Sequence, residues 1–262
     1  MKIRVLVTGA FGQLGKTIED FYADSQNKID FTFVSKATLD ISNKEALLTF
    51  LNHDTFDYCI NCAAYTNVEQ AEKTPEIAYQ INAESVKNLA QVCAEKNIIL
   101  IHISTDYVFD GNKNEPYIVD DKTNPINEYG KSKLLGEQFI QTVMNHYFII
   151  RTSWLYSKKH GRNFYKTILN KAKTESTLFV TNIEIGCPTD TESLALYIID
   201  LIKTNSKDYG IKHYCDSKPM TWYDFAKVIL IENDLLSKIK LVKNNNYCTF
   251  ATRPKYSVLK NS

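Results

Sequence analysis

The stretch VTGAFGQLG at residues 7–15 decides the fold. It lies between a strand-forming run at residues 3–7 and a segment at 13–23 whose pattern predicts a helix. In such a turn the first glycine permits a tight bend, the second lets the backbone approach a pyrophosphate, and the third allows close helix packing. The helix N-terminus would offer free N–H groups to the phosphates. Gly9, Gly12 and Gly15 therefore predict a dinucleotide-binding turn.

Strand-like and helix-like segments alternate after this turn. Strands are predicted at residues 31–34, 58–60, 98–103 and 147–150, and helices at 43–52, 75–96 and 127–144. Strands separated by helices of this length indicate right-handed βαβ units and a parallel sheet. We therefore expect an α/β fold, a Rossmann-like doubly wound parallel sheet with a smaller C-terminal substrate-binding lobe.

The domain boundary is expected near residue 152. Residues 1–152 would form the NAD(P)-binding domain and carry the catalytic residues. Residues 153–262 would form mainly the substrate-binding lobe, interleaved with the end of the sheet. Helices are predicted there at residues 163–173, 189–203 and 221–233.

Composition excludes several classes of protein. The 262 residues include 31 basic and 30 acidic side chains, so no strong net charge calls for nucleic acid or a membrane surface. No apolar stretch approaches the ~20 residues that cross a bilayer. The six cysteines are scattered and the five histidines lack metal-ligand spacing. We expect a cytoplasmic protein with no metal and with no nucleic-acid or membrane partner.

A second pattern lies on the predicted helix at 127–144. Tyr129 and Lys133 stand at positions i and i+4, so their side chains share one face. A lysine ammonium near a phenol favours the phenolate, which would lower the pKa of Tyr129 and suit it to acid–base catalysis. A tyrosine and a lysine at this spacing are common by chance. The pair therefore indicates a catalytic site only in combination with the other motifs of the sequence.

A third pattern, ISTDYVFDG at residues 103–111, follows the fourth predicted strand. Its hydroxyl groups would emerge at the carboxyl edge of the sheet, where open α/β sheets bind ligands. Ser104 or Thr105 would there hydrogen-bond a substrate oxygen beside Tyr129. The glycine turn, the hydroxyl residues and the tyrosine–lysine pair occur together in this order, a combination that is hard to obtain by chance.

The chain resembles the extended short-chain dehydrogenase/reductases and, among them, the dTDP-4-dehydrorhamnose reductases. The GxxGxxG spacing points to the former. The narrower resemblance covers nearly the whole chain and is carried by VTGAFGQLG (7–15), LDIS (39–42), NCAAYTNVEQAE (61–72), ISTDYVFDG (103–111), NPINEYGKSKLLGE (124–137), RTSWLYS (151–157), GCPTD (186–190) and RPKYSVL (253–259).

The resemblance implies roles for individual residues. Tyr129 would be the proton donor, with Lys133 as its partner and as a contact of the nicotinamide ribose, and Thr105 beside them. Cofactor contacts are implied at the phosphates, the adenine and the path after the third strand: Gly12, Gln13, Leu14, Asp40, Ile41, Ala63, Ala64 and Thr66. Sugar contacts are implied for Ser104, Thr105, Asp106 and Trp154.

The activity implied is NAD(P)H-dependent reduction of the C4 keto group of dTDP-4-dehydro-L-rhamnose to dTDP-L-rhamnose. NADPH or NADH would be the cofactor, a nucleotide-diphosphate sugar the substrate, and the protein a monomer or homodimer. Alternatives are another nucleotide-sugar reductase or epimerase, or a non-catalytic regulatory subunit like that of methionine adenosyltransferase. A dehydratase is disfavoured because no glutamate follows Asp106.

The end of the second strand bears on the choice of cofactor. Ser35 and Lys36 stand there, and no carboxylate occurs until Asp40. A hydroxyl and a lysine suit a 2′-phosphate, which a carboxylate would repel. We predict that NADPH is used at least as well as NADH. From the residues alone, Asp40 has an alternative role as a cap of the helix that starts near Asn43, and Trp154 as core.

Some positions depart from the family pattern or extend it. Ile183 and Glu184 replace a common Asp-Gln pair, and Ser217 and Lys218 stand where a glycine is expected. The chain stops at Ser262, before the usual final helix of the family. Asn82 is similar to an asparagine that distorts the third helix near the lysine.

Overall fold

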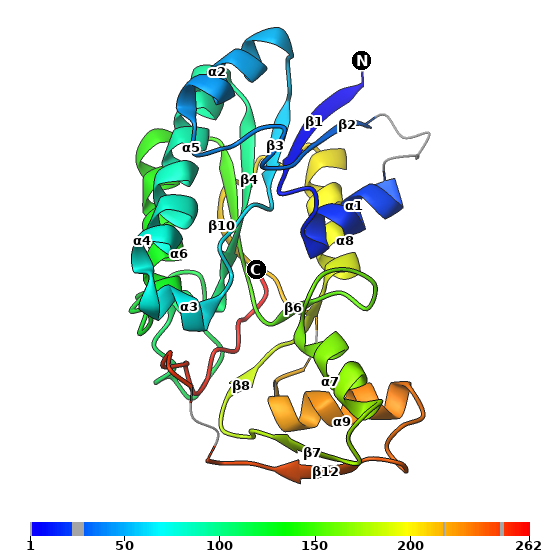
Figure 1. The fold of residues 1–262 in the computed structure, drawn as a ribbon. Helices are drawn as coiled ribbons and strands as arrows, with labels where there is room; N and C mark the ends of the chain where they lie inside the picture. Colours follow the sequence, from blue (N-terminus) through cyan, green and yellow to red (C-terminus); the bar gives the residue numbers. More distant parts are fainter. Residues whose placement is uncertain (1, 23–28, 217, 247–248) are drawn as a thin grey trace.

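A six-stranded parallel sheet forms the centre of the computed structural model, which describes residues 2–22, 29–216, 218–246 and 249–262 (Figure 1). Its strand order is β10-β5-β4-β3-β1-β2, and every neighbouring pair is parallel. The strands are β1 (Ile3–Thr8), β2 (Ile29–Val34), β3 (Tyr58–Asn61), β4 (Ile99–Thr105), β5 (Tyr147–Thr152) and β10 (Gly210–His213). This confirms the predicted parallel α/β fold.

Helices cover both faces of the sheet (Figure 1). On one face α2 (Lys44–His53), α5 (Ser85–Glu95) and α6 (Glu128–Val143) bury Leu6 and its neighbours. On the other, α1 (Gln13–Tyr22) and α8 (Thr191–Lys203) pack on Val5 and Val7. Successive strand residues point to opposite faces, so strands covered on both sides are apolar at nearly every position.

The direction of strand addition reverses beside β1. β2 pairs with one edge of β1, and the chain then crosses over to place β3 on the other edge. The connections after β1 and after β3 therefore leave the sheet in opposite directions, which opens a crevice at the carboxyl ends of these strands.

The segment predicted as one helix at residues 75–96 is interrupted. It consists of α4 (Pro75–Tyr79), a π-helical turn (Gln80–Glu84) and α5, and the short helix α3 (Val68–Lys73) precedes it. Asn82 lies in the π turn, where its side chain accepts from Tyr65 N at 2.9 Å and donates to Ser132 Oγ at 3.0 Å. The expected distortion at Asn82 is confirmed, and it ties this helix to α6.

A smaller lobe lies below the carboxyl edge of the sheet (Figure 1). Helices α7 (Phe164–Ala172) and α9 (Trp222–Glu232) pack there on the parallel pair of β7 (Thr177–Val180) and β12 (Lys240–Lys243). The short pairs β6–β9 (Leu155–Tyr156 with Thr189–Asp190) and β8–β11 (Ile185–Gly186 with Met220–Thr221) connect it to the sheet. None of the helices in the described ranges is long and apolar enough to span a membrane.

Candidate active site

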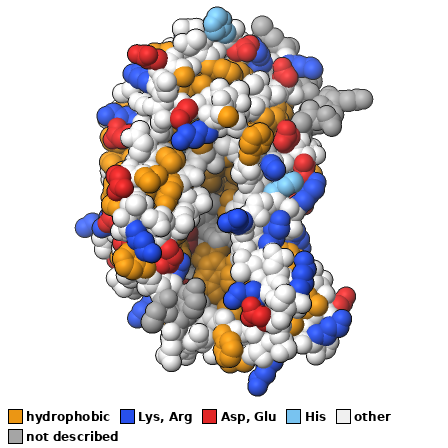
Figure 2. All heavy atoms as spheres, in the orientation of Figure 1, with side chains coloured by type: hydrophobic (Ala, Val, Ile, Leu, Met, Phe, Trp, Pro, Cys, Tyr) orange, Lys and Arg blue, Asp and Glu red, His pale blue; other side chains and the backbone are white. Residues whose placement is uncertain are grey.

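Two adjoining cavities follow the carboxyl edge of the sheet. The first, of about 740 Å³, lies beside β1, β2 and the π turn, and the second, of about 710 Å³, lies between the sheet and the smaller lobe. Gly12, Cys62 and Ala64 line both cavities, which therefore adjoin along these residues and are called the channel below. Figure 2 shows the surface hollowed between the two lobes, with hydrophobic side chains inside the hollow.

The glycine turn borders this channel and is too crowded for other residues. Gly9 has φ +66°, and a Cβ there would lie 2.5 Å from Ala63 N. A Cβ on Gly15 would lie 2.7 Å from Gly9 O, whereas Gly12 N donates to that same oxygen at 2.9 Å. The turn thus brings the backbone of β1, the β3 end and the α1 N-terminus together. Such a terminus, with no acidic residue in its first turn, fits a pyrophosphate.

Gln13 contacts the smaller lobe with its side chain. Its Nε2 donates to Leu155 O at 3.0 Å, and its Oε1 accepts from Asn163 Nδ2 at 3.1 Å. These bonds use the amide oxygen of Gln13 and one of the two N–H groups on Nε2. Leu14 lines the second cavity beside it, and Ala63, Ala64 and Thr66 continue the wall after β3.

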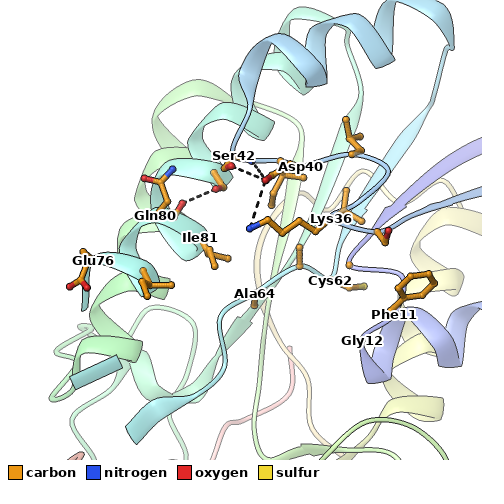
Figure 3. Close-up of a pocket in the computed structure, with 18 residues that line it drawn as sticks. Phe11, Gly12, Lys36, Asp40, Ser42, Cys62, Ala64, Glu76, Gln80 and Ile81 are labelled. Carbon is orange, nitrogen blue, oxygen red and sulfur yellow. Dashed lines mark hydrogen bonds and ion pairs between the residues drawn. The ribbon is translucent and has the colours of Figure 1, made fainter. Parts of the chain in front are cut away.

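The first cavity is also lined by Lys36 and Asp40 (Figure 3) and by Ile41. Asp40 Oδ1 accepts from Ser42 N at 2.9 Å and from Ser42 Oγ at 2.8 Å, and these bonds hold the pKa of Asp40 below its usual value. Lys36 Nζ lies 3.8 Å from Asp40 Oδ2. The cap of α2 is Asn43, whose Oδ1 accepts from Ala46 N, so Asp40 is not the helix cap.

Tyr129 lies in the second cavity with Thr105 as its polar neighbour. Burial raises the pKa of Tyr129 to about 12, and the side-chain hydrogen bond with Thr105 partly opposes this rise. The expectation that Lys133 lowers the pKa of Tyr129 is wrong for this structure. The ring of Tyr107 meets that of Tyr129 edge to face, with centroids 6.0 Å apart.

Lys133 is only 1% exposed, and its side-chain nitrogen points toward the sheet. Its Nζ donates to Ile103 O at 2.6 Å and lies 3.2 Å from His102 Nε2. Burial lowers the pKa of Lys133 to about 8, although the negative charge of Glu137 opposes this. Lys133 is therefore held by strand β4 rather than by the phenol four residues away.

Ser104 and Asp106 bind neighbouring side chains rather than facing the cavity with free groups. Ser104 Oγ donates to the buried carboxylate of Glu137. Asp106 accepts from Ser153 Oγ at 2.9 Å, from Ser257 Oγ at 2.5 Å and from Thr105 Oγ1 at 3.1 Å. Burial raises the pKa of Asp106 to about 6. Of the three residues expected to hold the sugar after β4, Thr105 is the one beside Tyr129.

Trp154 forms an aromatic wall of the second cavity with a residue that sequence reasoning missed. Its indole stacks on that of Trp222, with centroids 3.4 Å apart and planes 5° apart. Trp154 has φ +48°, and a Cβ on Gly186 would lie 2.5 Å from its ring. Other lining residues that received no expected role are Tyr107, Phe164, Arg162 and Arg253. The aromatic residues at the start of α9 were the feature of the sequence that could have indicated the role of Trp222 in this wall.

The family departures lie outside the cavity wall or outside the described residues. Ile183 is exposed, and Glu184 accepts from Thr181 Oγ1 at 3.0 Å. Ser217 lies outside the described residues. Within the described ranges, no group of three or more His, Cys, Asp or Glu side chains is arranged to hold a metal ion.

Comparisons with known proteins give a consistent result. The family described as "RmlD substrate binding domain" matches residues 1–262. A dTDP-4-dehydrorhamnose reductase of Escherichia coli is 38% identical over 98% of this chain and 89% of its own length. A dTDP-4-keto-6-deoxy-D-glucose reductase of Streptomyces niveus is 32% identical over 99% and 89%. The structure of a Bacillus anthracis dTDP-4-dehydrorhamnose reductase in complex with NADP is similar with a TM-score of 0.95 and 38% identity, covering 100% of this chain and 92% of that one.

Proposed function

This chain belongs to the RmlD substrate-binding-domain family, and we propose on that premise that it is an NAD(P)H-dependent nucleotide-sugar reductase. Its reaction would be reduction of the C4 keto group of dTDP-4-dehydro-L-rhamnose to give dTDP-L-rhamnose. The observation that carries the proposal is the channel of two adjoining cavities, with the glycine turn lining it on one side and Tyr129 and Thr105 in its second cavity.

The residues of the first cavity fit a nicotinamide dinucleotide. Gly9, Gly12 and Gly15 have no side chains, so a pyrophosphate can approach the backbone at the α1 N-terminus. Side chains of ordinary size at these positions would block the approach. Ile41 and Asp40 would border the adenine, and Ala63 and the residues after it would border the path toward Tyr129. When bound, the cofactor would supply a hydride to the carbonyl carbon of the sugar.

Tyr129 would give the proton that completes the reduction. As the carbonyl oxygen becomes an alkoxide, the phenolic O–H bond breaks and an O–H bond forms on the sugar, which leaves a phenolate. The hydroxyl of Thr105 would fix the phenol and the sugar oxygen side by side. Lys133, when protonated and turned toward Tyr129, would favour the phenolate by its charge.

The smaller lobe would bind the substrate. We propose that residues 1–152 carry the cofactor and the acid–base pair, while residues 153–262 contribute mainly the walls around the nucleotide sugar. Trp154 and Trp222 would pack on that ligand. Ser104 and Asp106, whose polar atoms bind Glu137, Ser153 and Ser257, would support Thr105 from behind. The protein would act in the cytoplasm as a monomer or homodimer.

One assay tests this function. Purified protein is mixed with NADPH or NADH and with enzymatically generated dTDP-4-dehydro-L-rhamnose, and the loss of nicotinamide absorbance is followed. We expect oxidation of the cofactor in proportion to dTDP-L-rhamnose formed, and a rate lower by ~10²–10⁴ with the Tyr129→Phe variant. A parallel arm with dTDP-4-keto-6-deoxy-D-glucose separates the two sugars named for the relatives. Absence of turnover with both sugars would refute the proposal.

A further inference from the structure

A buried chain of polar side chains runs across three strands to Lys133. Sheet register places Thr8 beside Asn61, and Asn61 beside His102. Thr8 Oγ1 donates to Asn61 Oδ1 at 2.7 Å, Asn61 Nδ2 lies 3.0 Å from His102 Nδ1, and His102 Nε2 lies 3.2 Å from Lys133 Nζ. These four residues are at most 1% exposed, so their hydrogen bonds must be satisfied within the chain.

The backbone fixes which way the amide of Asn61 faces. Ala63 N, which can only donate, points at Asn61 Oδ1 at 3.2 Å, and the Thr8 hydroxyl donates to the same atom. The oxygen of Asn61 must therefore face these donors. Its NH₂ group then faces His102 and donates to Nδ1.

This orientation determines the tautomer of His102. Nδ1 accepts a hydrogen bond and carries no proton, so the neutral ring is protonated on Nε2. Burial holds the pKa of His102 well below its usual value, so the ring stays neutral. The Nε2–H bond consequently points at Lys133 Nζ.

Lys133 can accept that hydrogen bond only as a neutral amine. An ammonium group has three donors and no lone pair, so it would face the Nε2–H donor with another donor. The other titratable groups near Lys133 do not remove this conflict. Glu137 on α6 is paired with Arg151 of β5, burial raises the pKa of the Cys62 thiol to about 12, and burial keeps Tyr129 protonated.

We propose that Asn61 and His102 form a positioning pair that holds Lys133 as a neutral amine and releases it toward Tyr129 when it takes up a proton. The pair thereby makes the ammonium form available to the phenol and to the ribose of the cofactor. Neither residue touches the reacting atoms in this scheme. The kinetic consequence rests on the proposed function, whereas the tautomer and the proton state of Lys133 do not.

Nuclear magnetic resonance of ¹³C,¹⁵N-labelled protein tests the pair without turnover. The chain has five histidines, so the His102 ring is assigned by its loss in His102→Gln. We expect the Nε2–H tautomer from pH 6 to pH 9, and a Lys133 titration at least one pH unit below that of surface lysines. An Nδ1–H tautomer or an imidazolium in the parent protein would overturn the proposal.

Asn61→Asp is the decisive variant because it keeps the shape of the side chain and reverses the hydrogen bond to His102 Nδ1, so that position 61 accepts instead of donating. A carboxylate at position 61 still accepts from Ala63 N and Thr8, but it also accepts from Nδ1–H of His102. Nε2 then becomes an acceptor that binds the Lys133 ammonium. We expect the tautomer to switch, the Lys133 titration to move up by at least one unit, and turnover at pH 7 to fall at least tenfold.

Thr8→Val is the matched control for the tautomer. It removes one donor to Asn61 Oδ1 and leaves Ala63 N in place, so the Nε2–H tautomer should persist. A Lys133 titration unchanged by Asn61→Asp would refute the positioning role. If the variant does not fold, the tautomer of the parent decides alone. A parent with the expected tautomer but no sugar reduction would refute the proposed function and leave the pair standing.

Discussion

Glu137 and Arg151 form a two-pronged ion pair in the interior. Arg151 Nη2 lies 2.7 Å from Glu137 Oε2, and Arg151 Nε lies 3.1 and 3.2 Å from the two carboxylate oxygens. The side chain of Arg151 is 3% exposed and that of Glu137 is 0% exposed. Ser104 adds a hydroxyl donor to the carboxylate, and the centroid of the Phe109 ring lies 5.2 Å from the guanidinium carbon of Arg151. The pair thus connects α6, which carries Tyr129, to β4 and β5.

We predict that Glu137→Gln destabilises the fold strongly. The substitution leaves the Arg151 charge buried without its partner, which typically costs about 3–5 kcal/mol. The double variant Glu137→Gln/Arg151→Met removes both charges and should recover much of that loss. Urea unfolding of the parent, the single variants and the double variant measures this cycle. Equal stabilities of Glu137→Gln and the parent would contradict the prediction.

The acid–base pair predicts separable kinetic effects. Tyr129→Phe removes the transferable proton and keeps the ring, so turnover should fall by ~10²–10⁴. Cofactor binding, measured by titration calorimetry, should be retained. Lys133→Ala should weaken both turnover and cofactor binding, because its ammonium would serve the phenol and the ribose. Near-normal turnover of Tyr129→Phe would identify a different proton donor.

Cofactor choice is predicted from the edge of the first cavity. The Lys36 side chain is 79% exposed and reaches Asp40 only at 3.8 Å, so its charge is available to a 2′-phosphate. NADPH should be used at least as well as NADH. Lys36→Ala should lower kcat/KM for NADPH about tenfold and change that for NADH little, so NADH serves as the control. A clear NADH preference in the parent, unaffected by Lys36→Ala, would exclude this role.

Local patterns in the sequence were enough for five of the six strands of the sheet and for the glycine turn, whereas the edge strand β10 was not predicted. Alternating apolar segments predicted the strands and helices around the site, and Tyr129 and Thr105 lie together as expected. The partners of the other residues could not be predicted, because they come from distant parts of the chain. Ser257 binds Asp106 from 151 positions away, and His102 meets Lys133 from 31 positions away.

Pairings of this kind depend on the register of the sheet and on how loops fold over its carboxyl edge. Neither feature produces a recognisable pattern in the sequence. The π turn at Gln80–Glu84 has a similar cause. Asn82 binds the backbone of Tyr65 and the Ser132 hydroxyl, and a Cβ on Gly136 would lie 2.1 Å from Asn82 O. Packing against α6 therefore shapes a segment that helix propensity alone predicts to be regular.

Asp106 should make stability depend on pH in the acid range. Its pKa is raised to about 6 by burial, so the folded protein binds this proton more tightly than the unfolded chain does. The resulting stabilisation is present below the ordinary value near 4 and is lost as the pH rises through 6. Relative to Asp106→Asn, the parent should lose at most about 3 kcal/mol of unfolding free energy across this interval. Urea unfolding at pH 4, 5, 6 and 7 measures the difference, and a constant difference would contradict the prediction.

The stacked indoles of Trp154 and Trp222 predict an effect on substrate affinity alone. Trp222 comes from the smaller lobe and Trp154 from the loop after β5, so the stack lies where the lobes enclose the second cavity. An aromatic contact of this kind contributes about 0.5–1.5 kcal/mol beyond its buried area.

Trp222→Ala should therefore raise KM for the nucleotide sugar about 3- to 10-fold, while kcat and the KM for the cofactor change little. Trp222→Phe keeps a flat ring and should restore most of the affinity. Because Trp222 also packs on Phe164 and Phe225, thermal unfolding of each variant must be measured beside the kinetics. Phe179→Ala, an aromatic truncation on the exposed side of β7, is the matched control and should leave KM unchanged. An unchanged sugar KM in a folded Trp222→Ala variant would show that the stack supports the lobe and does not contact the substrate.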